Sequence, residues 1–117
     1  MAEAFANRYG GDVLVASSSG LAPAQMVARG TVQAMRELDV DVSAHTPRLY
    51  NPVQAAQCDL VINISGINLP GLRPKEVVTW QVDDPIGDPI ETFRIVRAEL
   101  EQRVMRLILD LRRRAKQ

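Results

Sequence analysis

The chain has 117 residues, which is enough for one domain with a modest hydrophobic core. Its 14 basic and 14 acidic residues give a net charge of zero, which argues against a dedicated nucleic-acid-binding protein. Hydrophobic residues make up 46% of the chain, too many for a disordered protein, and no apolar run approaches the roughly 18 residues of a membrane span. The first residues include an acid and no basic cluster, so no signal peptide is expected. We therefore expect a cytoplasmic protein with neither a membrane nor a nucleic-acid partner.

Residues 2–38 are predicted to form a helix, a strand and a second helix. Residues 2–9 are typical of a short helix that ends at the glycine pair after them. The apolar run in residues 12–17 does not alternate with polar residues, which is typical of a strand covered on both faces. Pro23 suits the first turn of the next helix, and Gly30 inside that helix predicts that another element packs closely against it. The core face of this helix recurs at helical spacing and comprises Val27, Thr31, Met35 and Leu38.

The second half of the chain is predicted to contain two strands and two helices. Residues 51–57 begin with Asn-Pro and predict a short helix, while residues 59–64 and 76–82 predict buried strands. Asp88 suits the N-cap of the last helix and Pro89 its first residue. The core face of that helix recurs at steps of three and four and comprises Phe93, Val96, Leu100, Val104, Leu107 and Leu111.

Buried strands that alternate with helices predict an α/β fold with a parallel sheet. In such sheets, binding sites lie beyond the carboxyl ends of the strands. In this chain, the segments that follow the three predicted strands are Ser17–Gly20, Ser65–Asn68 and Asp83–Gly87. We therefore expect these three loops to converge on a site.

Five segments together carry a family resemblance. They are Met-Ala-Glu-Ala-Phe at residues 1–5, Ser-Ser-Gly at 18–20, the segment 40–48, Trp-Gln-Val-Asp-Asp-Pro at 80–85, and the helical segment 93–104. In order and spacing they resemble motifs of the low-molecular-weight protein tyrosine phosphatases and the related thioredoxin-coupled arsenate reductases. The resemblance covers nearly the whole chain.

The resemblance implies a single domain over residues 1–117, built as a three-layer parallel sheet with helices on both faces. It implies attack of a cysteine thiolate on phosphorus through a phosphocysteine, without cofactor or metal. Asp84 would then be the general acid, with Asp83 as second choice, and Ser18 would support the phosphate loop. The implied substrate is a phosphotyrosine protein or a phosphorylated small molecule.

The phosphate loop implied by the family does not occur in this sequence. No Cys-x5-Arg pattern is present, so we expect a domain that starts at Met1 after that loop, truncated at its N-terminus and lacking the first strand. Cys58, the single cysteine, excludes an intrachain disulfide and is interpreted as a small buried apolar residue rather than a reactive thiol. Reading Ser17–Pro23 as a decayed phosphate loop is the weaker alternative. The resolving cysteines of the arsenate reductases are also absent, from residues 65–69, and a disulfide relay needs at least two thiols.

The candidate residues also have plain structural interpretations. An aspartate before a proline, as at Asp84, suits a turn, and Ser18 can be a simple hydroxyl at the end of a strand. His45 has no histidine or cysteine pair near it in the sequence, so a surface or packing role is preferred over a metal site. Trp80 is assigned to the core.

The sequence alone therefore predicts a phosphatase domain for phosphotyrosine-type monoesters that is inactive as it stands or whose start is misplaced. The alternatives are a non-catalytic binding or regulatory protein, and a relative of the arsenate reductases. Loss of an inner strand would leave backbone groups unpaired, at a cost of roughly 1–3 kcal/mol for each buried group. We therefore also expect two copies to associate through their open strand edges.

Overall fold

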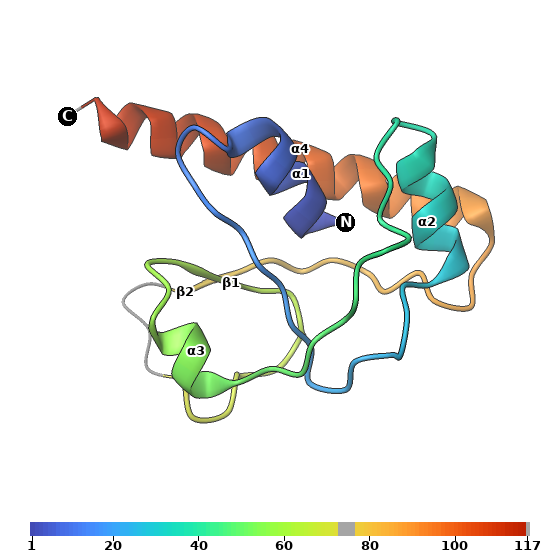
Figure 1. The fold of residues 1–117 in the computed structure, drawn as a ribbon, viewed down its shortest axis with the longest axis horizontal. Helices are drawn as coiled ribbons and strands as arrows, with labels where there is room; N and C mark the ends of the chain where they lie inside the picture. The colour runs from blue at the N-terminus through green and yellow to red at the C-terminus, as the bar shows by residue number, and fades with distance from the viewer. Residues whose placement is uncertain (73–76, 117) are drawn as a thin grey trace.

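The computed structural model describes residues 1–72 and 77–116. This part of the chain contains four helices and two short strands (Figure 1). In chain order they are α1 (Ala2–Gly10), α2 (Arg29–Arg36), α3 (Pro52–Ala56), β1 (Val61–Asn63), β2 (Val77–Thr79) and α4 (Ile90–Ala115).

The strands β1 and β2 pair in parallel, with Val61 opposite Val77 and Asn63 opposite Thr79. The predicted α/β class and parallel pairing are therefore confirmed. The sheet, however, has two strands in the described part of the chain, and the expected three-layer arrangement stays a prediction. Both strands are shorter than predicted, and residue 76 of the second predicted strand lies outside the described residues.

The long helix α4 lies along one side of the molecule and carries the core (Figure 1). Its contacts are mainly with α1 and α2. The predicted core face is confirmed from Phe93 to Val104, after which Ile108 is buried while Leu107 and Leu111 are only partly buried. The predicted N-cap is wrong, because Pro89 occupies the N-cap position and no side chain caps the helix.

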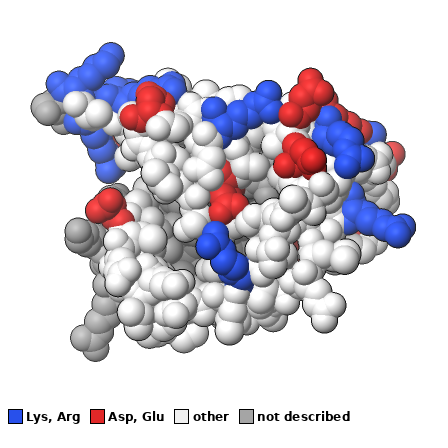
Figure 2. Space-filling model, in the orientation of Figure 1, with Lys and Arg blue, Asp and Glu red and all other residues white. Residues whose placement is uncertain are grey.

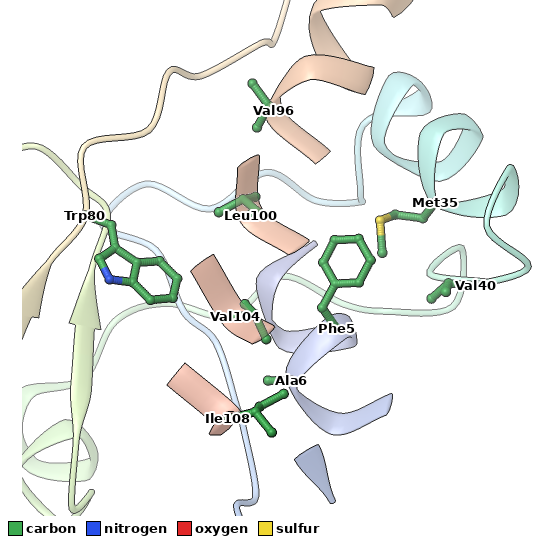
Figure 3. Packing of buried hydrophobic residues seen from close by; sticks show 9 residues of the cluster. All are labelled: Phe5, Ala6, Met35, Val40, Trp80, Val96, Leu100, Val104 and Ile108. Carbon is green, nitrogen blue, oxygen red and sulfur yellow. The ribbon is translucent and has the colours of Figure 1, made fainter. Parts of the chain in front are cut away.

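The core is made by residues from the helices on one side of α4 and from the sheet on the other. Phe5 of α1 and Met35 of α2 have no exposed surface, and Trp80, which directly follows β2, is 9% exposed. Figure 3 shows Trp80 approaching α4 from the side opposite Met35. The guanidinium of Arg103 lies 5.8 Å from the centroid of the Trp80 ring and covers it from solvent. The prediction that Trp80 belongs to the core is confirmed.

Gly30 makes the close contact that its place in a helix predicts. A Cβ atom at this position would lie 2.5 Å from two ring atoms of Phe93. Separations below 3.0 Å are essentially never found for real Cβ atoms, so the ring of Phe93 requires glycine here. This is how α2 comes close to the first turns of α4.

Residues 12–17 do not form the predicted strand. The segment begins in a turn, where the N–H groups of Val13 and Leu14 donate to the Gly10 carbonyl, and from Leu14 onward it has no regular structure. Near its end the backbone bonds with a side chain in place of a neighbouring strand. The Ala16 N–H donates to Asn7 Oδ1 over 2.9 Å, and Asn7 Nδ2 donates to the Ala16 carbonyl over 3.0 Å. A strand requires hydrogen-bond partners for the backbone groups of all its residues, whereas the side-chain amide of Asn7 bonds with the backbone of Ala16 alone. Val15 is 97% exposed, which is incompatible with a segment covered on both faces.

Two further helix predictions have different outcomes. The short helix α3 begins as expected, with Asn51 Oδ1 accepting from the N–H groups of Val53 (2.9 Å) and Gln54 (3.3 Å). The helix expected from Pro23 begins only at Arg29, because residues 21–28 adopt no regular helix.

Cys58 is exposed, so its interpretation as a buried apolar residue is wrong. It follows α3 at a turn, where its thiol lies 3.7 Å from the Gln54 carbonyl. None of the described helices is long and apolar enough to cross a membrane.

Candidate functional site

Two adjoining clefts lie beside the first turn of α1. One encloses about 240 Å³ and the other about 190 Å³, and both are lined by Ser18 and His45. The larger cleft is also lined by Met1, Glu3, Ala4, Val27, Thr31, Asp41 and Val42, and the smaller one by Ser19, Gly20, Pro23, Pro47 and Arg48. Three segments far apart in the sequence therefore meet here: the start of α1, residues 18–31 and residues 41–48.

The carboxylate of Glu3 lies at the centre of this site. His45 Nδ1 lies 3.2 Å from Glu3 Oε2, and Arg48 Nη2 lies 3.6 Å from Glu3 Oε1. The Glu3 side chain is 18% exposed and belongs to the first turn of α1, where the helix dipole favours a negative charge. His45 thus has the partly buried position that its packing interpretation predicts, and its partner is a carboxylate.

Backbone hydrogen bonds hold the walls of the smaller cleft together. The Gly20 N–H donates to the Arg48 carbonyl over 2.9 Å, and the Tyr50 N–H donates to the Gly20 carbonyl over 2.8 Å. These bonds form a parallel bridge between Gly20 and Leu49. The segment that carries Ser18 is therefore fixed against the segment that carries Arg48.

The two clefts differ in charge. The larger one contains two carboxylates, Glu3 and Asp41. The Ser43 hydroxyl (2.6 Å) and Ser43 N–H (2.9 Å) donate to Asp41 Oδ1, and these bonds lower the pKa of the Asp41 carboxyl. The smaller cleft has the guanidinium of Arg48 and no carboxylate in its lining. The Glu3 carboxylate lies 3.6 Å from Arg48, however, and therefore partly balances the charge of the smaller cleft.

The structure does not bring the two predicted site residues together. Ser18 lines both clefts, as its place beyond a predicted strand suggests. Asp84 is exposed, lines neither cleft, and accepts a hydrogen bond from the Ile86 N–H over 3.1 Å. This bond is the turn contact expected of an aspartate before a proline. Of the three loops expected to converge, only Ser17–Gly20 contributes to the clefts.

The loop after β1 is ordered by its own side chains. Asn63 is 7% exposed, and its Oδ1 accepts from the Ser65 N–H (3.0 Å) and the Ser65 hydroxyl (2.6 Å). Its Nδ2 donates to the Ile67 carbonyl over 2.8 Å. A polar residue between two isoleucines in a predicted strand was the signal for this turn.

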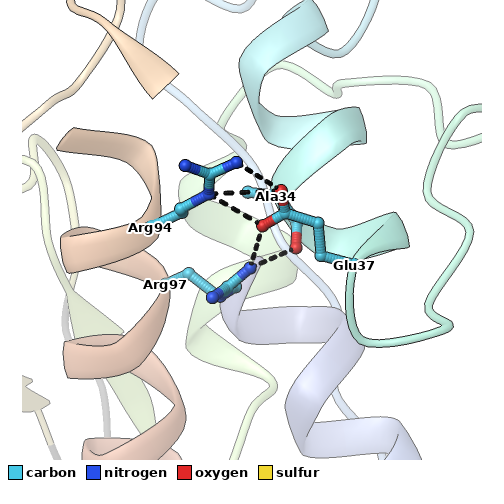
Figure 4. Close-up of polar contacts among 4 residues, drawn as sticks. All are labelled: Ala34, Glu37, Arg94 and Arg97. Atoms are coloured by element: carbon cyan, nitrogen blue, oxygen red, sulfur yellow. Dashed lines mark hydrogen bonds and ion pairs between the residues drawn. The ribbon is translucent and has the colours of Figure 1, made fainter. Parts of the chain in front are cut away.

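Two ion-pair clusters away from the clefts fix the helices to one another. Glu37, the C-cap residue of α2, binds both Arg94 and Arg97 of α4 at 2.7 Å, and Arg97 also donates to the Ala34 carbonyl over 2.8 Å (Figure 4). Hydrogen bonds from these arginines lower the pKa of Glu37 from its ordinary value of 4.5 to about 2.

Arg112, near the end of α4, binds the carboxylate of Asp12 over 2.9 Å and donates to the Tyr9 carbonyl over 2.9 Å. Figure 2 shows many cationic side chains at the C-terminal end of α4, with acidic side chains among them. The described part of the chain contains no group of three acidic, histidine or cysteine side chains that could hold a metal ion.

Comparisons with known proteins agree on one family. The sequence profile of the family "Low molecular weight phosphotyrosine protein phosphatase" matches residues 1–117. The chain is 34% identical over 119 aligned positions to the glutaredoxin arsenate reductase of Synechocystis, covering 95% of this chain and 87% of that protein. It is 33% identical to arsenate reductase 2 of Staphylococcus haemolyticus, and the alignment covers 86% of this chain and 79% of that protein. A solved structure of an arsenate reductase in the phosphate binding state superimposes with a TM-score of 0.81 at 32% identity, covering 94% of this chain and 86% of that one.

These matches correct the functional prediction from the sequence. The preference for a phosphatase over an arsenate reductase rested on the cysteines missing from residues 65–69, and the named relatives are arsenate reductases. Absent cysteines were thus a poorer guide than the motifs that are present. The chain belongs to the low-molecular-weight phosphotyrosine protein phosphatase family, and within it resembles the arsenate reductases.

Proposed function

We propose that this chain is the arsenate-binding domain of a thiol-coupled arsenate reductase. The observation that carries the proposal is the similarity to an arsenate reductase in the phosphate binding state, which extends over 94% of this chain. Phosphate and arsenate are both tetrahedral oxyanions, so a fold that receives one can receive the other. The curated relatives named above are arsenate reductases too.

The reaction determines which thiols are needed. Reduction of arsenate to arsenite takes two electrons: two thiols become one disulfide, and one arsenate oxygen leaves as water. These 117 residues contain a single cysteine, so at least one of the thiols must come from outside them. We propose a small thiol such as glutathione, used together with a dithiol protein of the glutaredoxin type.

Cys58 is poorly placed to meet the oxyanion. It precedes β1, whereas Asp84 follows β2, and the two strands are parallel, so these residues belong to opposite ends of the sheet. In Figure 1, α3, which directly precedes Cys58, lies far from the N-terminus of α1. We therefore assign the electron supply to thiols outside these 117 residues.

Two side chains of this chain are assigned to the chemistry. Asp84 is the general acid that gives a proton to the departing arsenate oxygen, since it is exposed and lies in the loop after β2. Ser18 supports the bound oxyanion, because it is a lining residue of both clefts. The family resemblance supports both assignments.

The test measures arsenite formed from arsenate in the presence of glutathione, glutaredoxin and glutathione reductase, against the same mixture without this protein. Asp84→Asn should lower kcat about 100-fold, as expected for loss of a general acid. Asp88→Asn is the matched control, because Asp88 is also exposed and the substitution removes the same charge four residues away. The kcat of this variant should stay within about twofold of the wild-type value. A wild-type protein that forms no arsenite above the thiol background would refute the proposed function.

A further inference from the structure

We propose that two copies of this chain pair through the outer face of α4, with the two helices antiparallel and Gln102 at the twofold axis. The proposal concerns an interaction surface and goes beyond the proposed function, because it does not depend on the reaction that the protein catalyses. Its evidence is the spacing of the exposed residues on α4 and the distribution of charge among them.

The outer face of α4 is a narrow stripe of exposed residues on the side opposite the buried residues of this helix. Counting outward from Gln102, exposed residues occur four, seven and eleven positions away in both directions. At 3.6 residues per turn they all lie within roughly 40° of Gln102 around the helix axis. In chain order the stripe comprises Glu91, Ile95, Ala98, Gln102, Arg106, Leu109 and Arg113.

The mirror spacing makes the stripe complementary to itself. In an antiparallel pair about a twofold axis at Gln102, a residue before Gln102 faces the residue equally far after it in the second copy. Ile95 therefore lies beside Leu109 of the second copy. These side chains are 69% and 48% exposed, so both have apolar surface that the contact would remove from water.

The charges of the stripe select the antiparallel orientation. Glu91, its one acid, lies in the first turn of α4, whereas Arg106 and Arg113 lie in the C-terminal half. Neither arginine makes an ion pair or a side-chain hydrogen bond with the residues that the structure describes. Antiparallel pairing places each Glu91 beside an Arg113 and sets the helix dipoles in opposite directions. Parallel pairing would place Arg113 beside Arg113, which is repulsive.

The centre of the stripe allows close approach of the two helices. Ala98 is small and faces Arg106 of the second copy, whose apolar stem can lie across it. Exposed ion pairs contribute little, and one helix face is a small interface. We therefore expect a weak dimer whose population rises with protein concentration.

The first experiment tests the position of the twofold axis by disulfide cross-linking with diamide as the oxidant. All variants carry Cys58→Ser, which removes the native thiol. Packed helices have axes about 8–10 Å apart, which brings facing Cα atoms within the roughly 7 Å that a disulfide can span. Gln102→Cys should therefore form a covalent dimer.

Arg106→Cys is the matched control, since this position is also exposed. In the proposed pair its two copies lie eight residues apart along the helices, which is about 12 Å and too far for a disulfide. We expect Gln102→Cys to cross-link at least about tenfold faster. Equal rates in the two variants would overturn the proposed register.

The second experiment measures dimerisation of the full chain by sedimentation equilibrium. Wild type should dimerise with a Kd below about 1 mM, and Ile95→Gln should weaken the dimer at least about tenfold. Ile86→Gln is the control, because Ile86 is 66% exposed and lies outside α4, and its Kd should stay within about twofold of the wild-type value. A wild type that remains monomeric up to about 1 mM would overturn the proposal. A dimer that Ile95→Gln leaves unchanged would also overturn it, because the contact would then lie elsewhere, for example at the strand edges.

The third experiment exchanges the charges. Arg113→Glu should weaken the dimer about fivefold, because two exposed ion pairs are lost in each dimer. Adding Glu91→Arg should restore the affinity, since the pairs then form with their charges reversed. Circular dichroism checks that each variant folds. Failure of the folded double variant to regain affinity over Arg113→Glu would overturn the antiparallel pairing of Glu91 with Arg113.

Discussion

The helical half of the molecule and the half that carries the clefts are built in different ways. Around α4, residues such as Phe5, Met35 and Ile108 are completely buried, and ion pairs join the residues just after α1 and α2 to α4. Around the clefts, the chain is extended or irregular and leaves apolar side chains exposed, with Val15 at 97% and Met26 at 74%. The clefts thus lie in the less tightly packed half.

The contrast follows from how each backbone satisfies its hydrogen bonds. A helix bonds within itself, so the 26 residues of α4 can form a scaffold that needs only side-chain partners. An extended segment needs a neighbour, and the cleft half finds it in single contacts such as Asn7 with Ala16 and Gly20 with Leu49. Binding residues commonly lie on loops that a rigid scaffold positions. We expect substitutions in the helical half to change stability, and those around the clefts to change local order or binding.

The largest stability effect is expected at Gly30, where α2 meets α4. Gly30→Ala places a Cβ 2.5 Å from the Phe93 ring, and an overpacked core position costs about 1–3 kcal/mol. The better helix propensity of alanine returns up to about 1 kcal/mol. Urea unfolding should therefore show a net loss on the order of 1–2 kcal/mol in the free energy of unfolding.

The control for Gly30 changes the partner. In a Phe93→Ala background the ring is gone, so adding Gly30→Ala should become stabilising instead of destabilising. If Gly30→Ala destabilises both backgrounds equally, contact with Phe93 is not the reason for glycine at this position.

A smaller, local effect is expected at Asn7, which joins the two halves. Asn7→Ala removes both hydrogen bonds to Ala16, and net losses of about 0.5–1.5 kcal/mol are typical for one such bond. Because the contact is exposed, we expect the free energy of unfolding to fall by about 1 kcal/mol in total. The rate of hydrogen exchange at the Ala16 amide should rise clearly. Asn68→Ala, at another exposed asparagine, should change neither quantity. An Ala16 amide that exchanges at the wild-type rate in Asn7→Ala would contradict this account of the extended segment.

The same contrast explains what could be predicted from the sequence. Helix signals are local, so α1, the Asn51 cap of α3 and the core face of α4 up to Val104 were predicted correctly. Strands depend on partners elsewhere in the chain, so the strand over residues 12–17 was wrong and a side-chain amide took the place of its neighbour.

The site was predictable only in part, for a related reason. Ser18 lines both clefts, while its predicted role as support for a phosphate loop stays a prediction. The cluster joins Glu3 to His45 and Arg48, more than 40 residues later in the sequence, and no local spacing indicates that Glu3 meets them. Each lies in a motif of the family resemblance, and that was the one available signal.

The smallest effect concerns pH and belongs again to the helical half. The pKa of Glu37 in the folded state is about 2, below its ordinary value of 4.5, because Arg94 and Arg97 donate to its carboxylate. A carboxylate with a lowered pKa stabilises the folded state above the unfolded pKa, and this contribution fades as pH falls from about 4.5 towards 2. Wild type should therefore be more stable than Glu37→Gln near pH 7, and the difference in thermal midpoint should shrink between pH 5 and pH 3. Asp83→Asn, at an exposed aspartate outside this cluster, is the control and should show no such convergence. A difference between wild type and Glu37→Gln that stays constant down to pH 3 would mean that the carboxylate charge of Glu37 does not stabilise the junction of α2 and α4, which would then rest on contacts such as the packing at Gly30 and the hydrogen bond from Arg97 to the Ala34 carbonyl.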